Sequence, residues 1–190
     1  GRGRRVTPEL EEAYAEPHRR YHTRAHIEQC LALLDQVPDL TETEQQILTY
    51  AIWWHDAVYD PKASDNEAKS AEMAKRDLRD FDVSLHARDE VARLIRLTAG
   101  HQVEEGDRLG EILVSIDLSI LGAPEDRYDA YAKAVRAEYA HVPDDLWRTG
   151  RSGVLQRFLD AQVIFPDPAF AHWLEAQARA NLSRELASLT

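Results

Sequence analysis

The 190-residue chain has little cysteine and little glycine, and it has no long hydrophobic run. Its single cysteine, Cys30, excludes a disulfide within the chain and is typical of reducing compartments, so we expect a cytoplasmic protein. No stretch approaches the ~20 apolar residues that a membrane-spanning helix needs. No apolar segment follows the basic N-terminal residues, so no signal peptide is predicted.

An excess of positive charge is also missing. Acidic residues outnumber basic ones by 34 to 23, and the net charge is -11. Nucleic-acid binding needs clustered Lys and Arg side chains that neutralise phosphates, whereas the basic residues here are scattered along the chain. We therefore expect neither nucleic acid nor a membrane as partner, and we leave a homodimer open.

Helical periodicity runs through nearly the whole sequence. Ile27, Cys30 and Leu34 recur at helical spacing, and Thr41 followed by Glu44 has the form of a capping box at a helix start. Prolines stand where later helices are expected to begin, which suits their missing N–H. The pattern predicts an all-α protein, a compact bundle of roughly seven helices.

No repeat or linker divides the sequence, so we expect a single domain over residues 1–190 with the metal-site core at about 21–122. Residues 1–7 are expected to be flexible or foreign to the domain. The most apolar run, 109–121, is interpreted as a buried helix, and its β-branched content keeps a strand open.

The most informative stretch is 51–59, where an apolar helical run ends in His55 and Asp56. Burying an imidazole beside a carboxylate is unfavourable unless both have partners. A divalent cation accepts a neutral imidazole nitrogen and a carboxylate oxygen together. The dipeptide alone is weak evidence, because a helix C-terminus also favours histidine.

Further polar residues stand in apolar helical surroundings. His22 and His26 share a helix face, Asp117 interrupts the apolar run 112–121, and His101 follows a helix end. A carboxylate in such a run has a desolvation cost of several kcal/mol unless it is paired. Two imidazoles and two carboxylates suit Mn, Fe, Co, Ni, Zn or Mg, with water in the open positions.

The order His26, then His55-Asp56, then Asp117 resembles the H…HD…D signature of the HD-domain superfamily, metal-dependent phosphohydrolases on an all-α fold. The resemblance runs from about Tyr21 to Leu186. It is closest to a bacterial branch described as predicted metal-dependent HD phosphohydrolases. The segments that carry it are 21–27, 55–59, 65–71, 117–122 and 150–151.

The resemblance implies that His26, His55, Asp56 and Asp117 bind a divalent metal ion. Many relatives carry a histidine where Asn66-Glu67 stands here. This difference argues against a second metal ion and makes Glu67 a candidate general base.

The activity implied is hydrolysis of a small phosphorylated molecule by metal-activated water, with nucleotides as the leading substrate class. Asp56 is expected to align the attacking water as well as to bind metal, and Glu67 is its expected catalytic partner. Five further residues are expected to contact the substrate, Arg151 from a loop: His22, Arg24, Lys69, His101 and Arg151.

Two other functions stay open at this point. The first is a non-catalytic module that holds a nucleotide or a structural metal ion. The second is a di-iron oxygenase, whose further ligands would have to come from His22, His86 or His101. Plainer interpretations also exist, since Asp117 is equally explained by a buried ion pair and Glu67 by the preference of acids for the first turn of a helix.

Overall fold

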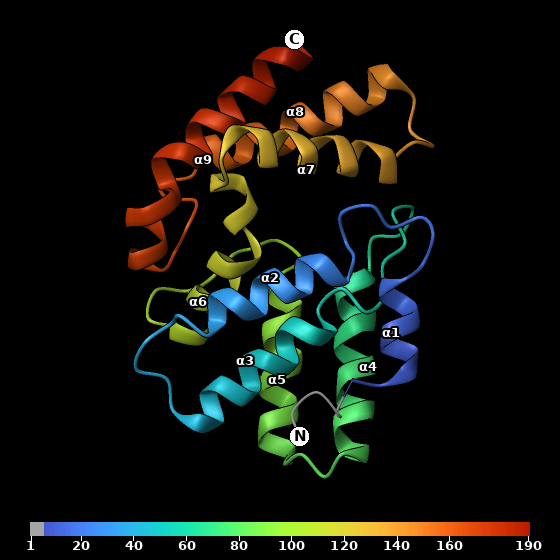
Figure 1. Cartoon of the computed structure of the whole chain (residues 1–190), viewed down its shortest axis with the longest axis vertical. Helices are drawn as coiled ribbons and strands as arrows, with labels where there is room; N and C mark the ends of the chain where they lie inside the picture. The colour runs from blue at the N-terminus through green and yellow to red at the C-terminus, as the bar shows by residue number, and fades with distance from the viewer. Residues whose placement is uncertain (1–5) are drawn as a thin grey trace. The chain divides into compact units, whose positions relative to one another are not determined.

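The computed structural model describes residues 6–190, and in this range it has nine α-helices, one short 3₁₀ helix and no strand (Figure 1). The prediction of an all-α protein is confirmed, with more helices than the seven expected. None of the described helices combines the length and the apolar character that crossing a bilayer requires.

Contacts divide the chain into two compact units, which meet in the sequence between Leu113 and Val114. The boundary falls inside α6 (Arg108–Asp117). The first unit contains α1 (Pro8–Tyr14), α2 (Arg24–Leu34), α3 (Glu42–Trp54), α4 (Asn66–Asp80) and α5 (Leu85–Leu97). The second contains η2 (Ser119–Gly122), α7 (Glu125–Glu138), α8 (Asp144–Asp160) and α9 (Pro168–Leu189).

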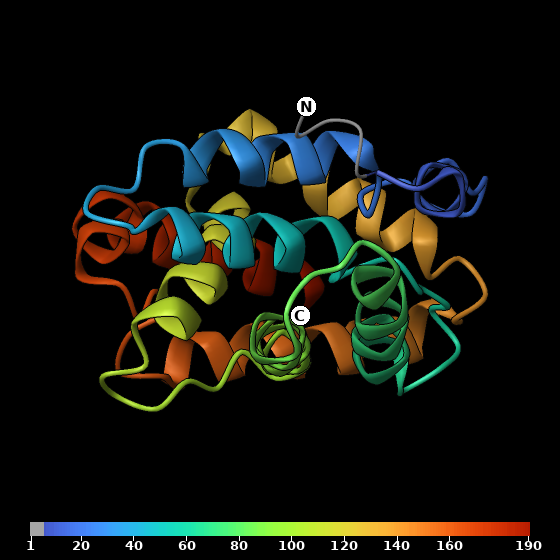
Figure 2. The ribbon, with the colours of Figure 1, turned by 90° about the horizontal axis from the view of Figure 1, so that it is seen from below.

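Two antiparallel helix pairs build the first unit. Helices α2 and α3 lie side by side, and so do α4 and α5 (Figure 1). Figure 2 shows α4 and α5 end-on while α2 and α3 run across the view, so the two pairs cross steeply. Helix α3 contacts both α4 and α5, and the apolar run that ends at His55 therefore lies at the centre of this unit.

Local capping bonds explain where several helices begin. The Thr41 hydroxyl accepts from the Glu44 N–H at 3.1 Å, and the Glu44 carboxylate accepts from the Thr41 N–H at 2.9 Å, which confirms the capping box. Ser84 caps α5 by accepting from Ala87 N–H. Thr7 caps α1 in the same way, and residues 1–5, part of the segment expected to be flexible or foreign to the domain, lie outside the described range.

The core of the first unit combines large side chains of α3 with small ones of α4. Trp54 is buried and donates its indole N–H to Asp77 at 3.0 Å, which satisfies its one polar atom. Ala71 and Ala74 are fully buried and let α4 approach its neighbours closely. Burial of each large apolar side chain contributes about 1.5–3 kcal/mol, so Trp54, at 1% exposed, belongs to the core.

In the second unit, the long helix α9 packs against α8 and η2 (Figure 1). Asn181 of α9 is fully buried and donates to the carbonyls of Leu121 and Ala123 at 2.9 and 2.8 Å. Because a buried amide without partners would be costly, these bonds attach α9 to the segment around Gly122.

The apolar run 109–121 is helical, so the strand alternative is wrong. It is not one helix, however, because α6 ends at Asp117 and η2 follows. The chain forms a 3₁₀ turn at this point, in which Leu121 N–H bonds to the carbonyl of Leu118, three residues earlier, at 3.0 Å.

Candidate metal centre

His26 and His55 come together because α2 and α3 are antiparallel. His26 lies in the first turn of α2 and His55 directly follows the last residue of α3. One ring nitrogen of each lies within 4.8 Å of the other, and the ring centroids are 5.5 Å apart. Both imidazoles are buried. They belong to a group of side chains that could hold a metal ion.

The His55 ring is oriented by its own helix. Its Nδ1 lies 2.7 Å from the carbonyl oxygen of Ile52. A carbonyl only accepts, so Nδ1 carries a proton, and in the neutral form of the ring the lone pair is on Nε2. That Nε2 lies 3.1 Å from Oδ2 of Asp56. A backbone carbonyl holding the far nitrogen is the arrangement in which histidine commonly binds metals.

His26 faces the same carboxylate oxygen. Its Nε2 lies 3.8 Å from Asp56 Oδ2, while its Nδ1 is 3.0 Å from the Tyr21 hydroxyl. The Cys30 sulfur lies 3.8 Å from the ring nitrogens and packs against the imidazole. A divalent cation placed among these atoms would attract the carboxylate oxygen and accept a lone pair from each imidazole. The donor set of two imidazoles and a carboxylate therefore fits a divalent cation.

The backbone carbonyls at the end of α3 all have partners. His55 N–H bonds to Ala51, and Ala57 N–H bonds to Trp54. The Tyr14 hydroxyl donates to the Trp53 carbonyl at 2.7 Å. Burial, and next the negative charge of Asp56, raise the pKa of Tyr14, so this donor keeps its proton. Because the last carbonyl groups of α3 all accept hydrogen bonds, the turn that follows at Asp56 is held in one conformation.

Arg19 supplies the remaining bonds, and sequence reasoning missed it. Its guanidinium donates to the carbonyls of Asp56 at 2.7 Å and Ala57 at 3.1 Å, and to that of His22 at 3.1 Å. The side chain is fully buried. No sequence signal separates it from the exposed Arg20 beside it, because its acceptors lie far along the chain.

Asp117 is the last residue of α6 and belongs to the second unit, on the other side of the boundary between Leu113 and Val114. Its side chain is half-buried. Its role as a metal ligand stays a prediction from the sequence.

Glu67 lies in the first turn of α4 and is half-buried. The neighbouring Asn66 side chain bonds to both the N–H and the carbonyl of Asp60 at 3.1 and 2.9 Å, and the Ser70 hydroxyl accepts from Val58 N–H at 3.0 Å. These bonds fasten the start of α4 to the loop that follows Asp56. The Glu67 carboxylate makes no hydrogen bond or ion pair with any other described residue, and its catalytic role stays a prediction.

Two predicted substrate contacts lie on α2 or just before it. His22 stacks on Tyr59 with ring centroids 4.2 Å apart, and its centroid is 6.4 Å from that of His26, so it borders the centre. Arg24 is exposed and pairs with Glu28 at 3.1 Å and Glu11 at 3.6 Å. Exposed pairs of this kind are weak and leave Arg24 able to exchange partners.

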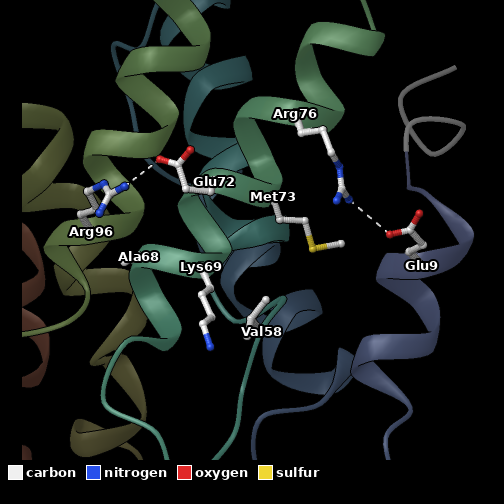
Figure 3. A pocket seen from close by; sticks show the side chains of 8 residues that line it. All are labelled: Glu9, Val58, Ala68, Lys69, Glu72, Met73, Arg76 and Arg96. Carbon is white, nitrogen blue, oxygen red and sulfur yellow. Dashed lines mark hydrogen bonds and ion pairs between the residues drawn. The ribbon is translucent and has the colours of Figure 1, made fainter.

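Lys69 lines a pocket of about 530 Å³ on one face of α4 (Figure 3). Its ammonium group lies 3.5 Å from Asp65 and is largely exposed. Apolar Val58 and Met73 form part of the lining. Ion pairs at the rim join Arg76 to Glu9 and Arg96 to Glu72, and Ala68 completes the lining.

The two remaining predicted contacts have structural explanations. His101 has a φ of 54°, and its N–H closes the end of α5 on the Leu97 carbonyl at 2.9 Å, so its backbone acts as a helix cap. Arg151 lies within α8, so its predicted position on a loop is wrong. Its guanidinium forms two bonds to Glu185 at 2.8 and 2.9 Å, and we leave it out of the proposed site.

Comparisons with protein-family models, with curated proteins and with solved structures find no match to this chain.

Proposed function

We propose that this protein is a metal-dependent phosphohydrolase of the HD type. It acts on a small phosphorylated molecule, and nucleotides are the leading class. The observation that carries the proposal is the convergence of His26 and His55 Nε2 atoms on one carboxylate oxygen of Asp56. The resemblance of the sequence motifs to HD phosphohydrolases supports the same conclusion.

His26, His55 and Asp56 would hold the metal ion in this proposal, with Asp117 as the fourth ligand expected from the sequence. The bond from His55 Nδ1 to the Ile52 carbonyl selects the tautomer in which Nε2 is the metal-binding nitrogen. A bound divalent cation lowers the pKa of a coordinated water toward 7 and polarises a phosphoryl oxygen.

The remaining steps belong to side chains of the chain itself. The Asp56 carboxylate orients the attacking water, and Glu67 accepts its proton as general base. Lys69 and Arg24 offset negative charge on the phosphoryl group, with His22 at the edge of the centre. The apolar pocket beside Lys69 receives part of the leaving group, which favours substrates with a hydrophobic or planar portion, such as a nucleoside.

The test is phosphate release from nucleoside mono-, di- and triphosphates and from p-nitrophenyl phosphate. Metal-free protein is assayed with Mn²⁺, Co²⁺, Zn²⁺ or Mg²⁺ added singly. We expect Asp56→Asn to lower metal-dependent turnover by about 100-fold or more. Asp60→Asn is the matched control, since Asp60 is an exposed carboxylate in the same loop.

Three results are informative. Turnover that needs metal and is lost only in Asp56→Asn supports the proposal. Metal binding to His26 and His55 without turnover of any substrate would favour a non-catalytic binding module. Absence of metal binding would overturn the assignment altogether.

A further inference from the structure

The buried Arg19 guanidinium makes four hydrogen bonds and one ion pair. Nη1 donates to the carbonyls of His22 and Asp56, and Nη2 donates to that of Ala57. Nε donates to one carboxylate oxygen of Glu16 at 3.0 Å, and the same oxygen lies 2.9 Å from Nη2 in an ion pair. These contacts occupy all three guanidinium nitrogens of a fully buried side chain, so Arg19 is not placed to bind a substrate.

The three carbonyls belong to two segments that carry proposed metal ligands. His22 precedes α2 and lies four residues before His26, whereas Asp56 and Ala57 form the turn after α3. The bond to Asp56 spans 37 positions of the chain and that to Ala57 spans 38. One side chain thus ties the start of α2 to the turn that holds His55 and Asp56.

The aromatic surroundings fix the guanidinium itself. Its central carbon lies 5.1 Å from the Tyr14 ring centroid and 5.6 Å from that of Tyr59. Cations above aromatic faces gain about 0.5–2 kcal/mol, and more when they are desolvated. The two rings fix the orientation of the Arg19 guanidinium, and the guanidinium in turn holds the Asp56 carbonyl. The direction of the Asp56 carboxylate therefore depends on the position of Arg19.

We propose that Arg19 is the positioning residue of the metal centre formed by His26, His55 and Asp56, an inference that rests on the proposed metal-dependent function. It acts through the Asp56 backbone and touches neither metal nor substrate. Lysine cannot replace it, since an ammonium group offers its three donors from one nitrogen, whereas the three carbonyls here accept from two separate nitrogens of Arg19.

The experiment titrates metal-free protein with Co²⁺ and records affinity and the visible absorption bands, which report the number and arrangement of ligands. We expect Arg19→Lys to weaken Co²⁺ binding by about tenfold, as outer partners of metal ligands do, and to shift the bands. Arg79→Lys, at an exposed arginine of α4, is the control and should match the wild type within about twofold. All spectra are taken well below each variant's unfolding temperature.

Glu16→Gln provides a second variant, because Glu16 is 44% exposed and its change disturbs the fold little. It loosens the guanidinium, and we expect Co²⁺ affinity to fall by a smaller factor in the same direction. If Arg19→Lys does not fold, as judged by circular dichroism, unchanged affinity and bands in Glu16→Gln would overturn the inference.

The outcomes separate this inference from the proposed function. If the wild-type protein binds no Co²⁺, both the proposed function and the role of Arg19 are rejected. A wild-type protein that binds Co²⁺, beside a folded Arg19→Lys variant with equal affinity and identical bands, would leave the proposed function standing and reject Arg19 as its positioning residue. A lower unfolding temperature with unchanged bands would likewise mean a purely structural role.

Discussion

Arg19 in the first unit and Arg151 in the second are both buried guanidinium groups, but they bind different partners. Arg151 faces a carboxylate, Glu185, which also accepts from the Tyr128 hydroxyl. Burial, and next the bond to Glu185, raise the pKa of Tyr128, so the tyrosine remains a donor. Arg19 also contacts a carboxylate, that of Glu16, but its three other hydrogen bonds go to backbone carbonyls.

We call the group of Arg151, Glu185 and Tyr128 the closed cluster, and the group of His26, His55 and Asp56 the open cluster. In the second unit, the Arg151 cation, the Glu185 anion and the Tyr128 hydroxyl bond to one another. In the first unit, two imidazole nitrogens face one carboxylate oxygen, an arrangement that a bound cation would complete. A buried charge alone therefore does not indicate a functional site. A better indicator is a set of buried metal-binding atoms that face one another.

The largest effect is expected where the closed cluster is broken. Arg151→Met leaves the Glu185 carboxylate buried without its cation, and we expect a loss of about 3–5 kcal/mol in the free energy of unfolding. Hydrogen exchange of amides in α8 and α9 measures it. Arg148→Met, one turn earlier on the exposed face of α8, should change protection little. Equal protection in both variants would show that the ion pair contributes nothing.

Next in size is the effect of metal on the open cluster. At a free metal concentration 100 times the Kd, binding stabilises the folded protein by about 2.7 kcal/mol. We expect the unfolding temperature of the wild type to rise with Co²⁺ or Zn²⁺, and that of His55→Ala to stay constant. His172→Ala, an exposed histidine on α9, serves as control and should respond like the wild type.

Acid should weaken metal binding, because protons compete for the imidazole lone pairs. Histidine has a reference pKa of about 6.5, and affinity should be constant above that pH. We expect affinity to fall about tenfold per pH unit for each histidine that must lose a proton. Isothermal titration with Zn²⁺ at pH 7.5, 6.5 and 5.5 measures this slope, and a constant Kd over that range would argue against histidine ligands.

A smaller effect is expected from a change in packing within the second unit. A Cβ added at Gly122 would lie 2.7 Å from the Leu174 Cβ and 2.9 Å from the Leu174 carbonyl oxygen. Gly122→Ala should therefore lower the free energy of unfolding by about 1–3 kcal/mol. Gly153→Ala on α8 meets no heavy atom within 4 Å and should raise it by up to about 1 kcal/mol. Urea unfolding of both variants measures whether the free energy of unfolding falls for Gly122→Ala and rises for Gly153→Ala.

Much of the helical framework was predictable because its signals are local. The Thr41 and Glu44 capping box joins residues three positions apart, so the sequence alone displays it. Apolar periodicity can also be recognised from the sequence alone, because the residues on one helix face recur every three or four positions. His55 and Asp56 were recognisable for a similar reason, as adjacent polar residues after an apolar run.

Local signals in the sequence were enough to predict most of the helical framework, the capping box of Thr41 and Glu44, and an imidazole and a carboxylate at the end of α3. Long-range contacts of the folded chain bring His26 beside His55, Arg19 to the Asp56 turn, and Arg151 to Glu185, 34 positions away. A cap or a periodicity is complete within a few residues and can therefore be recognised in the sequence. A buried polar group takes its partner from whichever segment the antiparallel helices bring beside it.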